Sequence, residues 1–272
     1  MSSLVRTEWL KMKKYNAFWW IMSITALSYP GINYISYMIY ENITSNSTQA
    51  GKLAKLAIGN PFTFPEAWHT VAYFSSLFVF IPAVVVIMLI CNEYSFKTHR
   101  QNIIDGWSRG QFISSKLMDV VLMTLLITLI YTIIAFVTGI VNQDRLITHT
   151  WEQAYYIGSF GLQTFSQLSI AFLVGFLVRK AFLALGIFLF YFIVLENIIV
   201  GIMSHYNVPG YKYFPLEISD RMIPRPAFFA KLDLEGYNKS LAEVPQHVFL
   251  TIILTAFIWA ICYRINSRRD LK

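Results

Sequence analysis

Residues 120–143 read VVLMTLLITLIYTIIAFVTGIVNQ, an uncharged stretch dominated by Leu, Ile, Val and Thr. A helix needs roughly 20 such residues to cross the hydrocarbon core of a bilayer. The stretch lacks the alternation of polar and apolar residues that marks the strands of a membrane barrel. Because lipid leaves only helices and closed barrels as spanning structures, this stretch predicts a transmembrane helix and an all-α fold.

Five further apolar runs occur along the 272-residue chain. The six runs predict transmembrane helices over 17–40, 67–92, 117–141, 154–178, 181–203 and 246–265. The composition agrees, since 56% of the residues are hydrophobic and only 14% are charged, values typical of integral membrane proteins rather than soluble domains. We expect a single transmembrane domain over 1–272.

Basic residues are concentrated on one side of the predicted spans. That side carries Arg6, Lys11, Lys13, Lys14, Lys97, Arg100, Arg109, Lys116, Arg179, Lys180, Arg264, Arg268, Arg269 and Lys272. Few acids accompany them, so the positive-inside rule predicts a multi-pass protein of the cell membrane with both termini in the cytoplasm. Topology and attraction to anionic lipid then explain the net charge of +7, and no nucleic-acid partner is expected.

Two segments outside the spans have distinct compositions. Residues 1–16 place Leu4, Trp9 and Met12 on one helical arc and predict an interfacial elbow helix; an ordinary basic flank is the alternative. Residues 204–245 are rich in proline and carry both signs of charge. We expect an extracellular loop with short helices there, because charged side chains are not buried in lipid.

A polar, basic segment over 93–116 separates the second and third predicted spans and is called the coupling segment below. On a helix that starts at Ser95, the side chains of Phe96, Ile103 and Trp107 share a narrow arc with Arg100, a pattern typical of an amphipathic helix. Phe96, Arg100, Ile103 and Trp107 are the expected contacts with a partner, since aromatic residues and Arg dominate interface cores. A loop with an incidental lipid-surface helix is the alternative.

The coupling segment also contains signals for the end of one helix and the start of the next. Gly106 is expected to cap the amphipathic helix. The sequence Ser108-Arg109-Gly110-Gln111 matches a capping box, in which Ser108 and Gln111 satisfy each other's backbone amides. A new helix is therefore predicted from Ser108 into the third span.

The chain lacks the usual signatures of catalysis. It contains no G-x-x-x-x-G-K-[ST] loop to bind ATP phosphates, and its histidines and cysteines have no zinc-ligand spacing, so we expect no enzyme activity, cofactor or metal on this chain. Glu196, next to Asn197, is the one carboxylate placed well inside a span and is a functional candidate. Alternatively, Glu196 is a hydrogen-bonded residue that fixes helix packing.

Three features together resemble the ABC-2 type permease family: the basic start LVRTEWLKMKKYNAFWW over 4–20, the six spans, and the pattern E-x4-T-x9-S-R at Glu93, Thr98, Ser108 and Arg109. Many relatives have a proline before the Ser-Arg pair, where this chain has Gly106-Trp107. The resemblance implies that the coupling segment contains a coupling helix that sits in a groove of a separate ATP-binding subunit. The four residues of the pattern would form its motif.

The resemblance further implies the permease subunit of an ATP-driven ABC exporter. Two ATP-binding subunits would supply ATP and Mg, and a second permease would complete a homodimer or heterodimer. Relatives of this size include permeases for immunity to bacitracin-like and lantibiotic peptides, which favours an amphipathic or peptide-like substrate. Two alternatives stay open: an ATP-independent transporter or channel with Glu196 in an ion or proton relay, and an intramembrane enzyme, which is disfavoured because no pair of catalytic groups shares a span face.

Overall fold

A computed structural model of the chain describes residues 2–44, 59–143, 149–206, 208, 210–226 and 234–268. Every regular element among these residues is helical, which confirms the all-α prediction. The elements are α1 (Ser2–Lys14), α2 (Asn16–Ile43), α4 (Ala67–Ser76), α5 (Phe80–Ser95), α6 (Thr98–Ile104), α7 (Arg109–Val141), α8 (Tyr155–Val178), α9 (Ala181–Phe190), the π-helix η1 (Tyr191–Leu195), α10 (Glu196–His205), the 3-10 helix η2 (Tyr211–Tyr213), α11 (Pro215–Asp220) and α13 (Leu234–Arg268).

Four helices of the described chain are long and apolar enough to cross a bilayer, and a bent pair raises the number to five. The four are Arg109–Val141, Tyr155–Val178, Ala181–His205 and Glu235–Arg268. The pair consists of α4 and α5, which meet at an angle of 50°. The predicted number of six is not confirmed, because α2 is not among these spans. Its many Tyr, Trp, Asn and Ser residues lower its mean hydropathy.

The predicted span over 67–92 consists of two helices with a break at 77–79. Pro82 is the third residue of α5. A proline has no amide hydrogen and its ring clashes with the carbonyl four residues earlier, so it is tolerated in the first turn of a helix and not in the interior. Helix α4 therefore ends before this proline and a new helix, α5, begins. Between them the backbone forms hydrogen bonds of the 3-10 type, such as Phe78 N–H to Ser75 C=O (3.1 Å).

Helix α8 forms the centre of the bundle. In the most apolar stretch of α8, 61% is buried inside the bundle, compared with 17% in that of the span Ala181–His205. It packs on α5 closely enough that a Cβ on Gly175 would lie 2.7 Å from Ile90 Cγ2. On another side the Trp259 ring of α13 stacks on Phe172 (centroids 4.8 Å apart) and its Nε1 donates to Ser169 Oγ (3.0 Å). In lipid such close packing and interhelical hydrogen bonds associate helices, since there is no hydrophobic drive between them.

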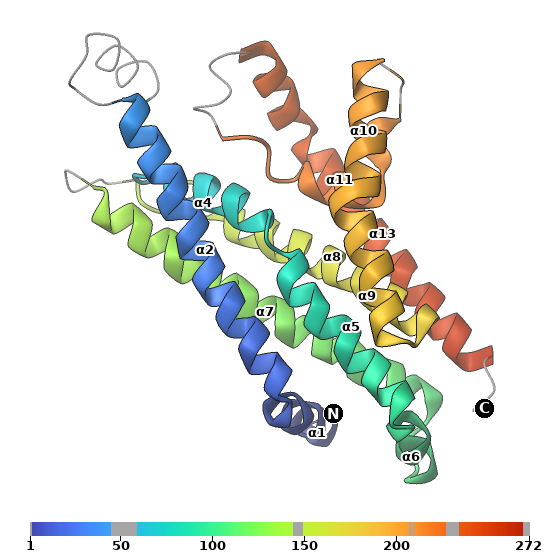
Figure 1. Ribbon diagram of the computed structural model, residues 1–272. Helices are drawn as coiled ribbons and strands as arrows, with labels where there is room; N and C mark the ends of the chain where they lie inside the picture. The colour runs from blue at the N-terminus through green and yellow to red at the C-terminus, as the bar shows by residue number, and fades with distance from the viewer. Residues whose placement is uncertain are drawn as a thin grey trace.

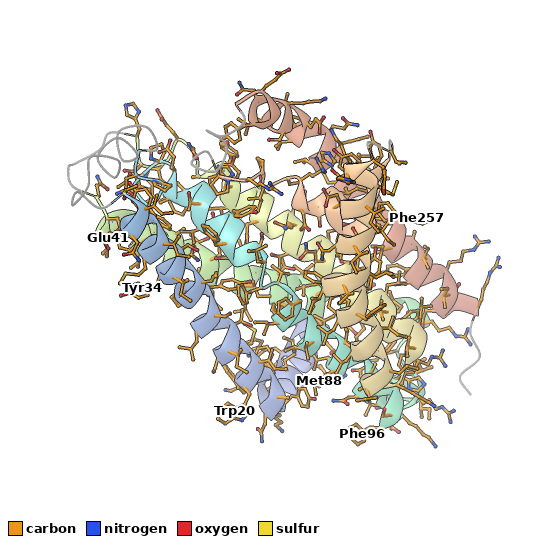
Figure 2. The ribbon with its side chains drawn as sticks, turned by 45° about the horizontal axis from the view of Figure 1, so that its top comes forward. Trp20, Tyr34, Glu41, Met88, Phe96 and Phe257 are labelled. Carbon is orange, nitrogen blue, oxygen red and sulfur yellow. The ribbon has the colours of Figure 1, made fainter. Side chains whose placement is uncertain are left out.

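The bundle has two distinct ends. Helices α1 and α6 lie at one end together with both chain termini, and α4, α11 and the end of α10 lie toward the other (Figure 1). Side chains such as Trp20 and Tyr34 project outward from α2, and Phe96 lies at the end where α6 is found (Figure 2). Trp20 is 73% exposed, as expected of a lipid-facing side chain.

The region over 204–245 differs from the expected loop. It contains the expected short helices, η2 and α11. From Leu234 onward, however, the chain is part of the long helix α13. Pro245 lies inside this helix and did not mark its start. An interior proline leaves one carbonyl without its usual helical donor. The helix thus begins before the span predicted over 246–265.

Candidate functional site

The coupling segment folds as a turn followed by a short helix. Helix α5 continues to Ser95, and Lys97 then adopts a left-handed conformation with φ of 56°. Helix α6 starts at Thr98, so the amphipathic helix is shorter than the sequence suggested. Gly106 ends it with φ of 101°, and the Trp107 amide donates to the Asn102 carbonyl (3.0 Å). The predicted glycine cap is confirmed and has the geometry of a Schellman motif.

The next helix begins as the capping box predicted. Ser108 Oγ accepts from the backbone N–H of Gln111 (3.1 Å), and the side-chain Oε1 of Gln111 accepts from the backbone N–H of Ser108 (2.8 Å). Arg109 reaches the end of α13, where its Nη1 donates to the Ser267 carbonyl (2.7 Å), while Asn266 Nδ2 donates to the Arg109 carbonyl (2.7 Å). Arg109 thus connects the start of α7 to the C-terminal helix, while Ser108 caps α7.

The side chains proposed as partner contacts divide into two groups. Phe96 is 76% exposed and Ile104, which was not in the proposed set, is 77% exposed. Arg100, Ile103 and Trp107 are half-buried. The Trp107 ring lies 5.7 Å from Lys11 Nζ on α1, a cation–π distance. Two apolar side chains therefore face outward from this segment, while Trp107 connects it to the first helix.

A buried group of charges lies behind the coupling segment and is called the lysine cluster; it consists of Glu8, Lys11, Glu93, Lys116 and Asp119. Lys116 Nζ lies 2.6 Å from Glu8 Oε2, 2.7 Å from Glu93 Oε1 and 3.2 Å from Asp119 Oδ2. Lys11 Nζ lies 2.9 Å from Glu8 Oε1 and 3.1 Å from Glu93 Oε1. The Lys116 side chain is only 4% exposed. The cluster joins α1, the end of α5 and the start of α7.

This cluster changes the role of the sequence motif. Glu93 is buried and its carboxylate binds lysines of the same chain, and the Thr98 hydroxyl donates to the Glu93 carbonyl (3.4 Å). The structure brings all four motif residues into contacts within this chain. No signal in the sequence indicated that Glu8 and Lys11 of α1 meet Glu93 and Lys116, because that contact depends on how α1 folds back on the bundle.

Burial opposes the ionisation of Glu8, which is only 2% exposed. The charges and hydrogen bonds of Lys116 and Lys11 outweigh that effect, so the pKa of Glu8 is lowered below its ordinary value. Glu8 is therefore held as a carboxylate that keeps the first helix against α7.

A second set of contacts attaches α6 to the turn between α8 and α9. His99 Nδ1 lies 3.1 Å from the Glu93 carbonyl oxygen, and the His99 and Tyr94 rings are 4.7 Å apart. Arg179, at the C-terminal end of α8, places its guanidinium 4.7 Å from the Tyr94 ring. The coupling segment is thus supported from both α1 and α8.

A cavity of about 1010 Å³ lies among α4, α5, η1, α10, α11 and α13. We call it the acidic cavity, because Glu196, Glu217, Asp220 and Glu243 line it. It lies at the end of the bundle with α4 and α11, and α5 contributes only its first residue, Phe80, to the lining (Figure 1). Two of the helices around it are interrupted, at the break between α4 and α5 and at η1. Ligand pockets of transporters are commonly built from such discontinuous helices.

Glu196 and Asn197 follow directly on the π-helical turn. Asn197 is exposed, and its Nδ2 donates to the carbonyls of Phe192 (2.9 Å) and Ile193 (3.2 Å), which belong to that turn. Glu196 is 3% exposed, and its Oε1 accepts from the amides of Leu216 and Glu217 (2.8 Å each). Asn197 thus serves the local backbone, whereas Glu196 connects α10 to α11 and reaches the acidic cavity.

Asp220 is a site residue that sequence reasoning missed. Its Oδ1 accepts from Gln163 Nε2 and Gln167 Nε2 of α8, both at 2.7 Å. Desolvation by the surrounding protein raises the pKa of Asp220 to about 7, and neighbouring carboxylates add to this. The pairing of Gln163 and Gln167 at one helical turn on α8 was a weak signal, since polar residues in a predicted span face protein rather than lipid. No group of three or more His, Cys, Asp or Glu in the described chain could hold a metal ion.

A cavity between interrupted helices of a membrane bundle is an arrangement found in transport proteins. The family model described as ABC-2 family transporter protein matches residues 4–195. This match spans well over half of the 272 residues, and the chain belongs to that family. No match was found among curated proteins. The family match ends just before Glu196, so all four acids of the acidic cavity lie beyond it.

Proposed function

We propose that this chain is the permease subunit of an ATP-driven ABC exporter that uses a separate ATP-binding subunit. The observation that carries the proposal is the coupling segment: it is folded, it lies at the end of the bundle with both termini, and it presents Phe96 and Ile104 outward. Exposed aromatic and aliphatic side chains of this kind are anchors of protein interfaces. The absence of an ATP-binding loop in the sequence requires that ATP and Mg be bound by the partner.

The lysine cluster and the Tyr94–Arg179 contact explain how movement of the partner would reach the spans. The coupling segment is supported by α1 through Lys11 and Trp107, and by α8 through Tyr94 and Arg179. A push on α6 would therefore shift these helices together, as in rigid-body switching between two transport states. Glu93, Thr98, Ser108 and Arg109 support the segment through contacts within the chain, and Phe96, Arg100, Ile103 and Ile104 make up its contact surface.

The remaining architecture follows from the same proposal. Helix α2 is the sixth span, with its Trp and Tyr residues near the two lipid interfaces, and α1 is the interfacial elbow helix. Both termini lie in the cytoplasm of a cell-membrane protein. Two copies of the permease, or this chain and a similar one, would join two ATP-binding subunits. An amphipathic or peptide-like substrate would move outward, as in the bacitracin and lantibiotic immunity permeases.

Site-specific crosslinking tests the docking of α6. Both native cysteines, Cys91 and Cys262, are buried, so a cysteine placed at Ile104 offers an accessible thiol. The Ile104→Cys variant, tagged and treated in its own membranes with a thiol-reactive crosslinker, should yield an adduct whose partner carries a G-x-x-x-x-G-K-[ST] loop by mass spectrometry. Tyr206→Cys, 72% exposed and on the end of α10, is the matched control and should yield no such adduct.

A second pair of variants separates this proposal from its alternative. Phe96→Asp with Ile104→Asp should abolish association with the ATP-binding protein and stop transport. If the double variant still transports and no ATP-binding protein associates with the native chain, an ATP-independent transporter with Glu196 in an ion or proton relay replaces the exporter.

A further inference from the structure

The carboxyl groups of the acidic cavity are not compensated equally. Glu217 pairs with Arg221 (2.7 Å), and Glu243 pairs with Lys212 (2.5 Å). Glu196 and Asp220 have no Lys, Arg or His within 4.0 Å in the described part of the chain. Both are held by neutral donors, Glu196 by two backbone amides and Asp220 by two glutamine side chains. The cavity therefore has two carboxyls without a positive partner.

Glu196 is held without a positive partner. Its Oε1 accepts from both backbone amides, and the hydroxyl of Tyr191 on the π-helical turn is a further, neutral hydrogen-bond partner of the carboxyl. A buried carboxylate without a positive partner is costly, and a cation in the cavity would remove that cost.

The other wall of the cavity is apolar. Phe80 comes from the start of α5, and Phe192 and Ile193 from the π-helical turn; the Phe80 and Phe192 rings are 5.9 Å apart. Leu77, at the break between α4 and α5, and Ile193 also line the cavity and are about half exposed. An apolar group could thus lie on this wall.

We propose that the acidic cavity binds an amphipathic organic cation, with its positive group at Glu196 and Asp220 and its apolar part on Phe80, Phe192 and Ile193. This inference deepens the proposed transport function and rests on it, since it assigns a substrate class. An organic cation fits better than a metal ion, because no group of three metal-ligating side chains occurs among the described residues. Arg225, the remaining arginine of the lining, interacts with Tyr73 on α4 and leaves the two carboxyls uncompensated.

Equilibrium binding of radiolabelled tetraphenylphosphonium to the full chain in lipid nanodiscs tests the site, with protein-free nanodiscs as background. Tetraphenylborate is a matched probe of the same shape and opposite charge. The native protein should bind the cation saturably, and tetraphenylborate should compete far more weakly. Because each carboxylate attracts the cation by Coulomb interaction, Glu196→Gln and Asp220→Asn should each weaken binding about 10-fold.

The two substitutions preserve the protein's own hydrogen bonds, since the new amide oxygens still accept from the same donors. Gel filtration and melting temperature verify folding, and if one variant does not fold, the other carries the test. Glu41→Gln, an exposed acid at the end of α2 (Figure 2), should bind like the native chain. The proposal is overturned if the cation shows no saturable binding, if both cavity variants bind it as tightly as the native protein, or if tetraphenylborate competes equally.

The binding assay needs no ATP-binding subunit, so its outcome is independent of the crosslinking experiment. Failure of cation binding with the α6 adduct present would leave an ABC permease with a different substrate class. Saturable cation binding without any adduct would leave the cavity assignment intact and remove the proposed energy source.

Discussion

The lysine cluster and the acidic cavity are two groups of carboxyls that the same fold treats differently. At the end with α6, Glu8 and Glu93 are bound by Lys116 and Lys11 at distances of 2.6 to 3.1 Å. In the cavity, Glu196 and Asp220 are bound by neutral donors. The carboxylates of the first group have positive partners, whereas those of the second have none among the described residues.

This difference separates a structural role from a binding role. A buried carboxylate paired with lysine holds elements together, because removing either charge leaves the other uncompensated. A carboxyl held by neutral donors is fixed in position without losing its charge, which is the arrangement expected of a preorganised binding group. The paired group lies within the family match, and the acids of the cavity lie beyond it.

Removing the centre of the lysine cluster should have the largest effect. Lys116→Met leaves Glu8 and Glu93 buried without their main partner and should lower the free energy of unfolding by about 3–5 kcal/mol. Chemical denaturation in detergent measures it. Lys13→Met, an exposed lysine of α1, should cost less than about 0.5 kcal/mol. If the cost of Lys116→Met is no greater than that of Lys13→Met, the cluster does not hold the bundle.

The lysine cluster should also make stability depend on acid. Because the pKa of Glu8 is lowered in the folded state, its contribution to stability is fully present above the unfolded pKa of about 4.3 and is lost as the pH falls through the lower folded value. Melting temperatures measured from pH 6.5 down to pH 3 should drop below about pH 4.5, and Glu8→Gln should flatten that drop. Glu41→Gln should keep it; an identical drop in Glu8→Gln would assign it to other groups.

Cation binding at the acidic cavity should change over a different pH range. With the pKa of Asp220 at about 7, its carboxylate forms as the pH rises through 7, so tetraphenylphosphonium should bind several-fold more tightly at pH 8 than at pH 6. The other titratable or charged groups that line the cavity are Glu196, Glu217, Arg221, Arg225, Glu243, His247, Tyr73 and Tyr237. Asp220→Asn should abolish the change and His247→Gln should preserve it. The reverse pattern would assign the titration to His247.

The smallest effect is expected at the capping box. Ser108→Ala removes the acceptor of the Gln111 amide and should cost about 1 kcal/mol of stability, measured by chemical denaturation. Crosslinking through Ile104→Cys should continue in this variant, because Ser108 serves the start of α7. Loss of the adduct at unchanged stability would instead make Ser108 part of the docking surface.

Local signals in the sequence predicted local structure well. The capping box at Ser108 and the glycine cap at Gly106 depend only on residues next to them, and both are as predicted. The break near Pro82 and the helical continuation through Pro245 show the limit of such signals. The same residue type ends one helix and is accommodated in another, and the difference lies in packing that a single sequence does not display.

The sites were only partly predictable for the same reason. Glu196 was recognisable, because a carboxylate in an apolar run is conspicuous. Lys11, Lys116 and Glu8 were read as flanking charges, and Asp220 as part of an outer loop, since their partners come from distant parts of the chain. A helical pattern from Ser95 placed Phe96 and Trp107 on one arc, yet the left-handed turn at Lys97 sends Phe96 outward while Trp107 meets Lys11.

The most direct test of the two separate roles is a crossed measurement on one set of membranes. Docking is read as the crosslinked ATP-binding adduct through a thiol at position 104, and ligand binding as saturable tetraphenylphosphonium retained by the purified chain. Phe96→Asp should abolish the adduct and leave cation binding unchanged, whereas Glu196→Gln should leave the adduct unchanged and weaken cation binding about 10-fold. If either substitution abolishes both readouts in a folded protein, or if Glu196→Gln abolishes the adduct alone, the assignment of docking to one end and ligand binding to the other is contradicted.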